Sequence, residues 1–259
     1  MWSGFAAADK GAGRPLSGRR SGKRGGLFLN GLLTGSLAFR QIQLWLCQGI
    51  VMLIAIPAHE AAHAWASARL GDSTAKNAGR LTLDPRAHFD LFGALCMIFV
   101  GVGWAKPVGI NPRRFRHPKR DMALSAAAGP ACNLLLAYLS MLIYKVLYYK
   151  AGSGSLWQLL FLLCYCMVAL NINLAVFNLL PIPPWDGSRI LWAVLPPRYY
   201  FGVMRYERYI FLAFFFLLMA GFLDGPLSIA NSFVWGWLDK ATLFVDKALW
   251  APALGGAAL

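Results

Sequence analysis

The chain has 259 residues, of which 58% are hydrophobic and only 14% carry a charge. This composition excludes an ordinary soluble domain and favours a small polytopic membrane protein with no room for a large accessory domain. The formal net charge of +14 would suggest nucleic acid in a soluble protein, but here Lys and Arg lie between apolar runs, where the positive-inside rule accounts for them. We therefore expect a lipid bilayer, and no nucleic acid, as a partner.

The N-terminal part divides into two segments before the first long apolar run. Residues 1–26 are rich in Gly, Ser and Ala and strongly basic, which predicts a disordered tail. An organelle transit peptide has a similar composition and is the alternative for this segment. Residues 27–43 are expected to be a short interfacial or re-entrant segment, because their apolar part is too short to cross a membrane unaided. A membrane-embedded core should then span 44–223, followed by a C-terminal helix and tail over 224–259.

The first membrane helix is predicted from Leu44 to Leu70, closed by Gly71, and it contains the sequence His-Glu-Ala-Ala-His. Positions four apart project from one face of a helix, so His59 and His63 are placed to bind one metal ion. Two such His with an adjacent Glu are typical of zinc sites, in which Glu60 takes a proton from a water. An ionisable side chain within an apolar span costs about 2.5–3.5 kcal/mol, so this cluster indicates a function rather than a chance match.

The middle of the chain combines short extended segments with apolar runs. Residues 78–83 and 105–110 are predicted as short membrane-edge β-strands that could pair with an unwound peptide. The apolar run 91–104 between them is flanked by basic residues on both sides, which favours a re-entrant hairpin over a crossing. A further span is expected over 122–144, where the Gly129-Pro130 pair should break the helix and let another helix approach closely.

A second uncharged stretch runs from Leu156 to Trp185, and its prolines should end the helix near Leu180. Asp186 follows in a rigid turn at membrane depth and is the candidate third ligand, provided that its helix and the His helix descend toward the same face. Residues 209–223 should form another span, and 227–238 a return or interfacial helix. The sequence thus predicts an all-α polytopic membrane protein with about four to six transmembrane helices.

The orientation of the first helix contains a conflict that the sequence leaves open. Basic loops mark the cytoplasmic side, so a His pair near that side requires the helix to enter from outside. The basic tail before it should nevertheless stay inside. Either residues 27–39 cross the bilayer with help from neighbouring helices, or the tail is translocated.

Five stretches in order resemble the site-2 protease family of intramembrane zinc metalloproteases, and together they extend over roughly residues 44–215. The likeness is to the short bacterial branch, and no PDZ-like or CBS-like segment is present. The sequence departs from the family pattern at Asp84, where an Asn-Pro pair is more usual, and at Trp185, which could narrow access to Asp186. The matching stretches are residues 58–65, 79–85, 103–108, 128–133 and 177–187.

The resemblance implies one zinc ion per chain, with His59, His63 and Asp186 as ligands, Glu60 as general base and Asn178 stabilising the oxyanion. It implies an endopeptidase of the bacterial inner membrane that cleaves transmembrane segments of membrane-protein substrates near the cytoplasmic face. The alternative is a non-hydrolytic zinc-binding membrane protein, either a transporter or an inactive protease-like scaffold. A transporter should carry further ionisable groups along a path through the bilayer, and an inactive scaffold should have lost Glu60.

Three further polar residues have two interpretations each. The sequence leaves open whether Asn133 and Asn171 support the metal-binding side chains or only join neighbouring helices through hydrogen bonds. His88 lies in a polar loop, and we expect it to order that loop rather than to bind the metal.

Overall fold

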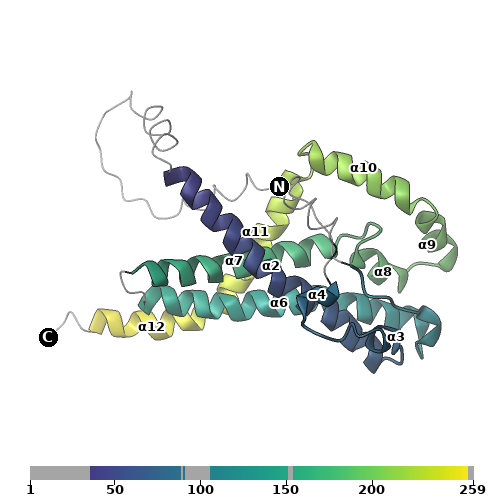
Figure 1. Ribbon diagram of the computed structural model, residues 1–259, viewed down its shortest axis with the longest axis horizontal. Coiled ribbons are helices and arrows are strands. Elements are labelled where there is room, and N and C mark those ends of the chain that lie inside the picture. The colour runs from purple at the N-terminus through teal and green to yellow at the C-terminus, as the bar shows by residue number, and fades with distance from the viewer. Residues whose placement is uncertain (1–35, 89, 91–105, 151–153, 256–259) are drawn as a thin grey trace.

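The body of the protein is a bundle of three long helices (Figure 1). The computed structural model describes residues 36–88, 90, 106–150 and 154–255. Each of the three helices is long and apolar enough to cross a membrane. They are α2 (Ser36–Arg69), α6 (Pro118–Lys150) and α7 (Ser155–Asn178).

A fourth apolar unit is a bent pair of helices, α10 (Glu207–Met219) and α11 (Asp224–Ala241). The two helices meet at 86°, so the pair is either one broken span or a re-entrant loop. The shorter helices connect these elements or follow them. They are α3 (Thr74–Asn77), α4 (Pro85–His88), the 3₁₀ helix η2 (Pro112–Arg114), α8 (Asp186–Trp192), α9 (Pro197–Met204) and α12 (Leu243–Gly255).

The prediction of an all-α polytopic membrane protein is confirmed. Within the part of the chain that the structure describes, three helices could cross a membrane, and a fourth span is reached only if the bent pair counts as one. Four is the lower end of the expected number, and three lies below it. The prediction of β-strands is wrong for residues 78–83 and for the described residues 106–110. The first segment instead caps α3, because the N–H groups of Gly79 and Arg80 donate to carbonyls of that helix. The expected re-entrant run 91–104 lies outside the described residues.

The backbone of residues 106–110 is occupied by partners other than a strand. The N–H of Lys106 donates to the carbonyl of His88, and the N–H of Val108 donates to the carboxylate of Glu60. A β-ladder needs these same N–H groups, so the contacts with a loop and a helix replace it.

Two predicted helix boundaries also change. Residues 36–43 were expected in a separate interfacial segment but form the start of α2, because no Pro or Gly interrupts the chain there; residues 1–35 lie outside the described part. The expected break at Gly129-Pro130 does not occur, since α6 continues from Pro118 to Lys150. Proline removes one N–H donor, and in a packed membrane helix that loss is tolerated. The predicted closure of the first helix at Gly71 is confirmed, and this glycine adopts a φ of 114°.

Small side chains let the long helices approach one another closely, as is usual in membrane bundles. Each of α2, α6 and α7 contacts the other two. One buried cluster joins α2 to α7 through Cys47, Val51, Ala55, Cys166 and Leu170. A second cluster joins α6, α7 and α11 through Ala137, Met141, Val168, Ile172 and Leu238.

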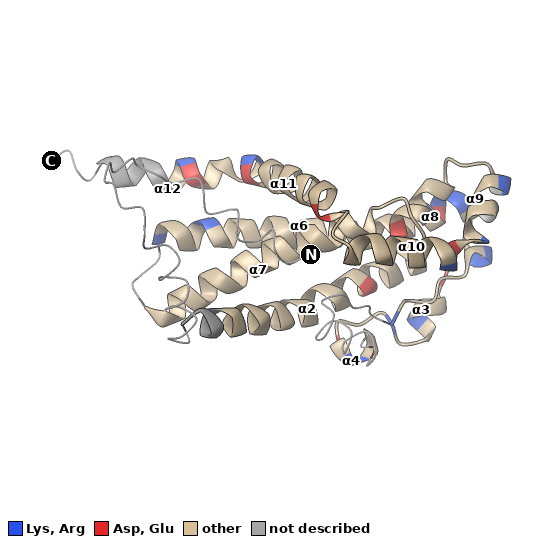
Figure 2. Ribbon diagram, turned by 90° about the horizontal axis from the view of Figure 1, so that it is seen from above, with Lys and Arg blue, Asp and Glu red and all other residues tan. Residues whose placement is uncertain are grey.

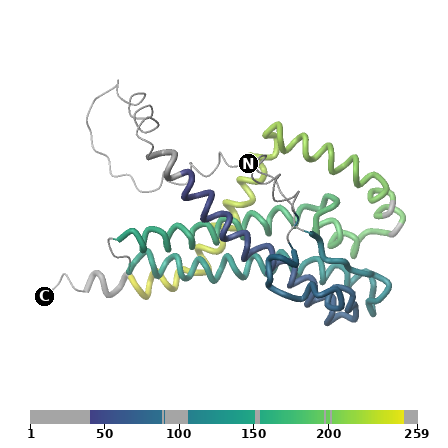
Figure 3. The backbone as a smooth tube through the Cα atoms, viewed as in Figure 1, coloured from purple at the N-terminus to yellow at the C-terminus, as the bar shows by residue number. Residues whose placement is uncertain are grey.

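The ends of the helices bring distant parts of the sequence together. α2 and α7 finish toward the end of the bundle at which α6 begins, and α3, α4 and α8 lie at the same end (Figures 1 and 3). Figure 2 shows Lys and Arg gathered at this end, whereas the middle of α2, α6 and α7 carries almost none. The charge distribution therefore gives the bundle a distinct basic end, which also holds the candidate ligands.

Candidate metal centre

The two histidines of the His-Glu-Ala-Ala-His sequence meet Asp186 in the bundle. His59 and His63 lie one turn apart on α2 and are only 7% and 5% exposed. Their Nε2 atoms are 3.0 Å apart, and Oδ2 of Asp186 lies 3.0 Å from Nε2 of His63 and 3.2 Å from that of His59. Three side chains that could hold a metal ion therefore converge from positions more than 120 residues apart.

Asp186 reaches the histidines because the chain turns sharply between α7 and α8. Prolines 181, 183 and 184 prevent α7 from continuing, and Asp186 becomes the first residue of the new helix. Gly187 permits this turn, since a β-carbon there would lie 2.3 Å from the carbonyl oxygen of Leu180. The hydroxyl of Ser188 donates to the carbonyl of Trp185 at 2.7 Å and closes the turn. Local chain geometry thus fixes the carboxylate at the end of α7.

Each imidazole is held from behind by α6. Nδ1 of His63 donates to the backbone carbonyl of Ser125 at 2.7 Å, and Nδ1 of His59 donates to the side-chain oxygen of Asn133 at 2.5 Å. Both partners are oxygens that accept, so each Nδ1 carries the ring proton. In a neutral imidazole the other nitrogen then has the lone pair. Both Nε2 atoms are therefore free to coordinate a cation.

The donor set fits a divalent metal ion such as zinc. Two lone-pair nitrogens and a carboxylate oxygen would repel one another at these separations without a positive charge between them. Ligand atoms about 2.0–2.1 Å from a tetrahedral zinc ion lie about 3.3 Å apart, so the observed 3.0–3.2 Å separations need to open only slightly. A carboxylate binds a metal in its ionised form, and a cation between these three atoms would favour that form of Asp186.

Glu60 lies beside the His pair but outside the group of three converging atoms. Its Oε2 accepts the backbone N–H of Val108 at 3.1 Å. Val108 is buried with Ala64 of α2 and Ala75 of α3, which anchors its loop against the end of the His helix. The loop therefore fixes one oxygen of the Glu60 carboxylate.

The structure does not bring Asn178 into the three-residue group. Asn178 is the last residue of α7, and its Nδ2 donates to the carbonyl of Leu174 at 2.9 Å. The amide carries a second N–H, which that bond leaves available. His88 is buried at the end of α4, where Nε2 donates to the carbonyl of Thr82 and the backbone carbonyl accepts from Lys106. These contacts agree with its expected role in ordering the loop.

Two residues of the centre were not identified from the sequence, namely Ser125 and Gly129 as neighbours of the His pair. Together with Asn133 they form a stripe on α6 at a spacing of four residues. This is the same spacing as that of the two histidines, so the two stripes face each other along one helix contact. A search for small and polar residues at this spacing would have found them.

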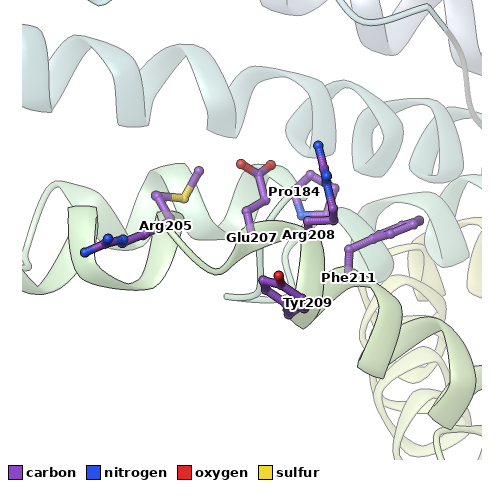
Figure 4. Close-up of a pocket in the computed structure, with 7 residues that line it drawn as sticks. Pro184, Arg205, Glu207, Arg208, Tyr209 and Phe211 are labelled. Atoms are coloured by element: carbon purple, nitrogen blue, oxygen red, sulfur yellow. The ribbon is translucent and has the colours of Figure 1, made fainter.

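A cavity of about 600 Å³ lies beside the turn that carries Asp186 (Figure 4). None of the three candidate ligands lines it. In Figure 4 the side chains of Glu207 and Arg208 point to the same side, near Pro184, while Arg205 points away. The cavity is thus separate from the metal group, although Pro184 is only two residues from Asp186. Its lining residues are Pro184, Met204, Arg205, Glu207, Arg208, Tyr209 and Phe211.

Comparison with known proteins gives matches to peptidases. The model of a family described as Peptidase family M50 matches residues 146–221. YwhC of Bacillus subtilis, named as a candidate zinc metalloprotease, is 36% identical over 176 residues, which cover 66% of this chain and 78% of YwhC. Rip2 of Mycobacterium tuberculosis, named in the same way, is 29% identical over 177 residues, or 67% of this chain and 66% of Rip2. No solved structure matches the chain significantly.

Proposed function

Because this chain belongs to peptidase family M50, the site-2 protease family, we propose that it is a zinc-dependent endopeptidase that cleaves transmembrane segments of other membrane proteins. The observation that carries the proposal is the convergence of His59, His63 and Asp186 inside a bundle of membrane-spanning helices. Three protein ligands leave one position for water, which is the arrangement of catalytic rather than structural zinc sites. The names of the relatives support zinc as the metal.

Each residue of the centre has a role in peptide hydrolysis under this proposal. When bound, zinc supplies the positive charge that acidifies a water and polarises the scissile carbonyl. His59, His63 and Asp186 hold one ion per chain. Glu60 accepts the proton of the attacking water and passes it to the leaving amine, with one oxygen held by the N–H of Val108. The free N–H of Asn178 donates to the oxyanion once substrate binds.

We assign the catalytic end of the bundle to the cytoplasmic face of a bacterial inner membrane. The gathering of Lys and Arg at this end supports the assignment through the positive-inside rule (Figure 2). The similarity to proteins of Bacillus and Mycobacterium supports a bacterial location. Cleavage would therefore take place near the cytoplasmic end of the substrate helix.

The test compares wild type with Glu60→Gln, using the full chain in lipid vesicles and a reporter with a single transmembrane helix between two fluorescent domains. We expect wild type to cleave the reporter within the helix, and Glu60→Gln to be slower by about 10²–10⁴-fold, as for loss of a general base. Zinc content should stay equal, because Glu60 is not a ligand. Equal cleavage by both proteins would exclude Glu60 as the base. Zinc binding without cleavage by wild type would favour a transporter or an inactive scaffold.

A further inference from the structure

A chain of buried amides connects His59 to the backbone of α7. Nδ1 of His59 donates to Oδ1 of Asn133, and Nδ2 of Asn133 donates to Oδ1 of Asn171 at 2.8 Å. Nδ2 of Asn171 in turn donates to the carbonyl of Met167 at 2.8 Å. Both Asn side chains are 0% exposed, so no water can substitute for either partner.

The direction of these hydrogen bonds is determined by their last member. A backbone carbonyl can only accept, so Asn171 must turn its NH₂ group toward Met167 and its oxygen toward Asn133. Asn133 must then present its NH₂ group to Asn171 and its oxygen to His59. This oxygen requires a proton on Nδ1 of His59 and leaves the lone pair on Nε2, which faces Asp186. Rotating either amide by 180° would bring like groups together.

The two histidines are supported in different ways. His63 is held directly by the main chain, through the carbonyl of Ser125. His59 is held by two side chains, those of Asn133 and Asn171. Asn133 belongs to α6 and Asn171 to α7. A substitution can remove the side chains that support His59, but not the main-chain carbonyl that supports His63. The Asn side chains also link the metal centre to the packing of α6 against α7.

We infer that Asn133 and Asn171 are positioning residues, which fix the tautomer and ring orientation of His59 so that its Nε2 faces the metal. The inference rests on the proposed metal centre. Partners of this kind behind a metal-binding His set its basicity and orientation, and their loss commonly lowers metal affinity by about 10–100-fold. Asn133 contacts His59 itself, whereas Asn171 acts one hydrogen bond further away. We therefore expect Asn133→Leu to weaken binding more than Asn171→Leu.

The chain offers a matched control in a second amide pair. Nδ2 of Asn231 on α11 donates to Oδ1 of Asn173 on α7 at 3.2 Å. This pair also joins two helices, but among the described residues no hydrogen bond connects it to either His. Asn173→Leu therefore removes an interhelical amide contact of the same kind without reaching the metal centre.

The experiment measures zinc affinity by chelator competition, and the visible spectrum of the cobalt-substituted protein, for the full chain in detergent. We expect about 10–100-fold weaker binding and an altered cobalt spectrum for Asn133→Leu, a smaller loss for Asn171→Leu, and wild-type values for Asn173→Leu. The double variant Asn133→Leu/Asn171→Leu should match Asn133→Leu alone, because both changes interrupt one chain. A purely structural role would lower the melting temperature and leave the zinc affinity of the folded protein unchanged.

The outcomes separate this inference from the proposed function. If wild type binds no zinc, or if His59→Ala binds it as well as wild type does, the metal centre itself fails. If wild type binds zinc, His59→Ala does not, and folded Asn133→Leu binds as wild type does, only the positioning role is overturned. Should Asn133→Leu fail to fold, wild-type affinity and an unchanged cobalt spectrum in Asn171→Leu overturn it.

Discussion

Gly129 lies against the coordinating edge of His63, and a β-carbon at this position would be 2.3 Å from Nε2 of that histidine. The same atom would lie 2.6 Å from Cε1 of His59. Any side chain at residue 129 would thus occupy the space in which the two imidazoles turn toward Asp186. The glycine of the Gly-Pro pair therefore serves the metal centre by having no side chain, while the helix that contains it remains continuous.

The first prediction concerns this contact. Gly129→Ala should displace both imidazoles and lower reporter cleavage by about 100-fold or more, because a misplacement of about 1 Å in a catalytic centre has effects of that size. Zinc content, measured by mass spectrometry after dialysis, should fall in parallel. Gly49→Ala on α2 is the control, since a β-carbon there meets nothing within 4 Å. Normal activity in Gly129→Ala would show that the His pair lies elsewhere in the working enzyme.

A second prediction tests the hydrogen bond from the N–H of Val108 to Glu60. Val108→Pro removes the donor, whereas Val108→Ala keeps it and loses only packing against Ala64 and Ala75. We expect the proline variant to lower kcat for the reporter by about 10-fold beyond the effect of alanine, equivalent to about 1.4 kcal/mol of transition-state stabilisation. Zinc affinity should be unchanged in both. Equal kcat values for the two variants would mean that the loop does not position the base.

The third prediction concerns Asp72, which joins the end of α2 to the loop before α6. This carboxylate is 0% exposed and accepts the N–H of Asn111 at 2.6 Å and that of Thr74 at 3.0 Å. Asp72→Asn turns an acceptor into a partial donor facing these N–H groups, and should lower the stability of the fold by about 1–3 kcal/mol at neutral pH. The melting temperature of the purified protein measures this change.

Asp72 also gives the stability a dependence on pH. Burial raises the pKa of Asp72. Hydrogen bonds from Thr74 and Asn111, together with the charge of Arg114, have a larger effect in the opposite direction, so the pKa lies below the ordinary 3.8. A depressed pKa means that the unfolded chain takes up the proton first as the pH falls. The stability that the Asp72 carboxylate contributes is thus fully present above pH 3.8, and it is lost as the pH falls through the lowered pKa of the folded protein. The difference in melting temperature between wild type and Asp72→Asn should shrink in acid, and a constant difference would contradict this account.

The fourth prediction concerns Trp185, which the sequence indicated could narrow access to Asp186. Its ring packs against aromatic rings of α7 and α10, at 5.0 Å from Phe177 and 4.3 Å from Phe214 between ring centroids. Trp185→Ala should free α10 from the turn and increase the rate of limited proteolysis between α8 and α10, and Trp185→Phe should keep most of the contact. Each aromatic pair contributes about 0.5–1.5 kcal/mol beyond its buried area. If Trp185→Ala cleaves the reporter faster but is not itself digested faster, Trp185 narrows access to Asp186 rather than holding α10 against the turn.

The sequence pattern predicted correctly those features that depend on a single helix. The long apolar runs predicted the spans, since a membrane allows few structures other than helices. The spacing of His59 and His63 required nothing beyond the geometry of one turn. The two predicted β-strands are wrong for the opposite reason, because a strand forms only with a partner. The N–H groups of residues 106 and 108 instead donate to the carbonyl of His88 and to the side chain of Glu60, and those of residues 79 and 80 donate to carbonyls of α3.

The sequence by itself determined that this protein is helical and membrane-embedded, and that a His-Glu-Ala-Ala-His turn and an Asp after a proline-rich stretch are the candidates for a metal site. Only the tertiary structure decided that Asp186 comes within 3.2 Å of both imidazoles, and that Ser125 and Asn133 hold them from behind. Periodicity along one helix follows from its own backbone. Distances between helices depend on packing, and here on a glycine whose missing side chain makes the space.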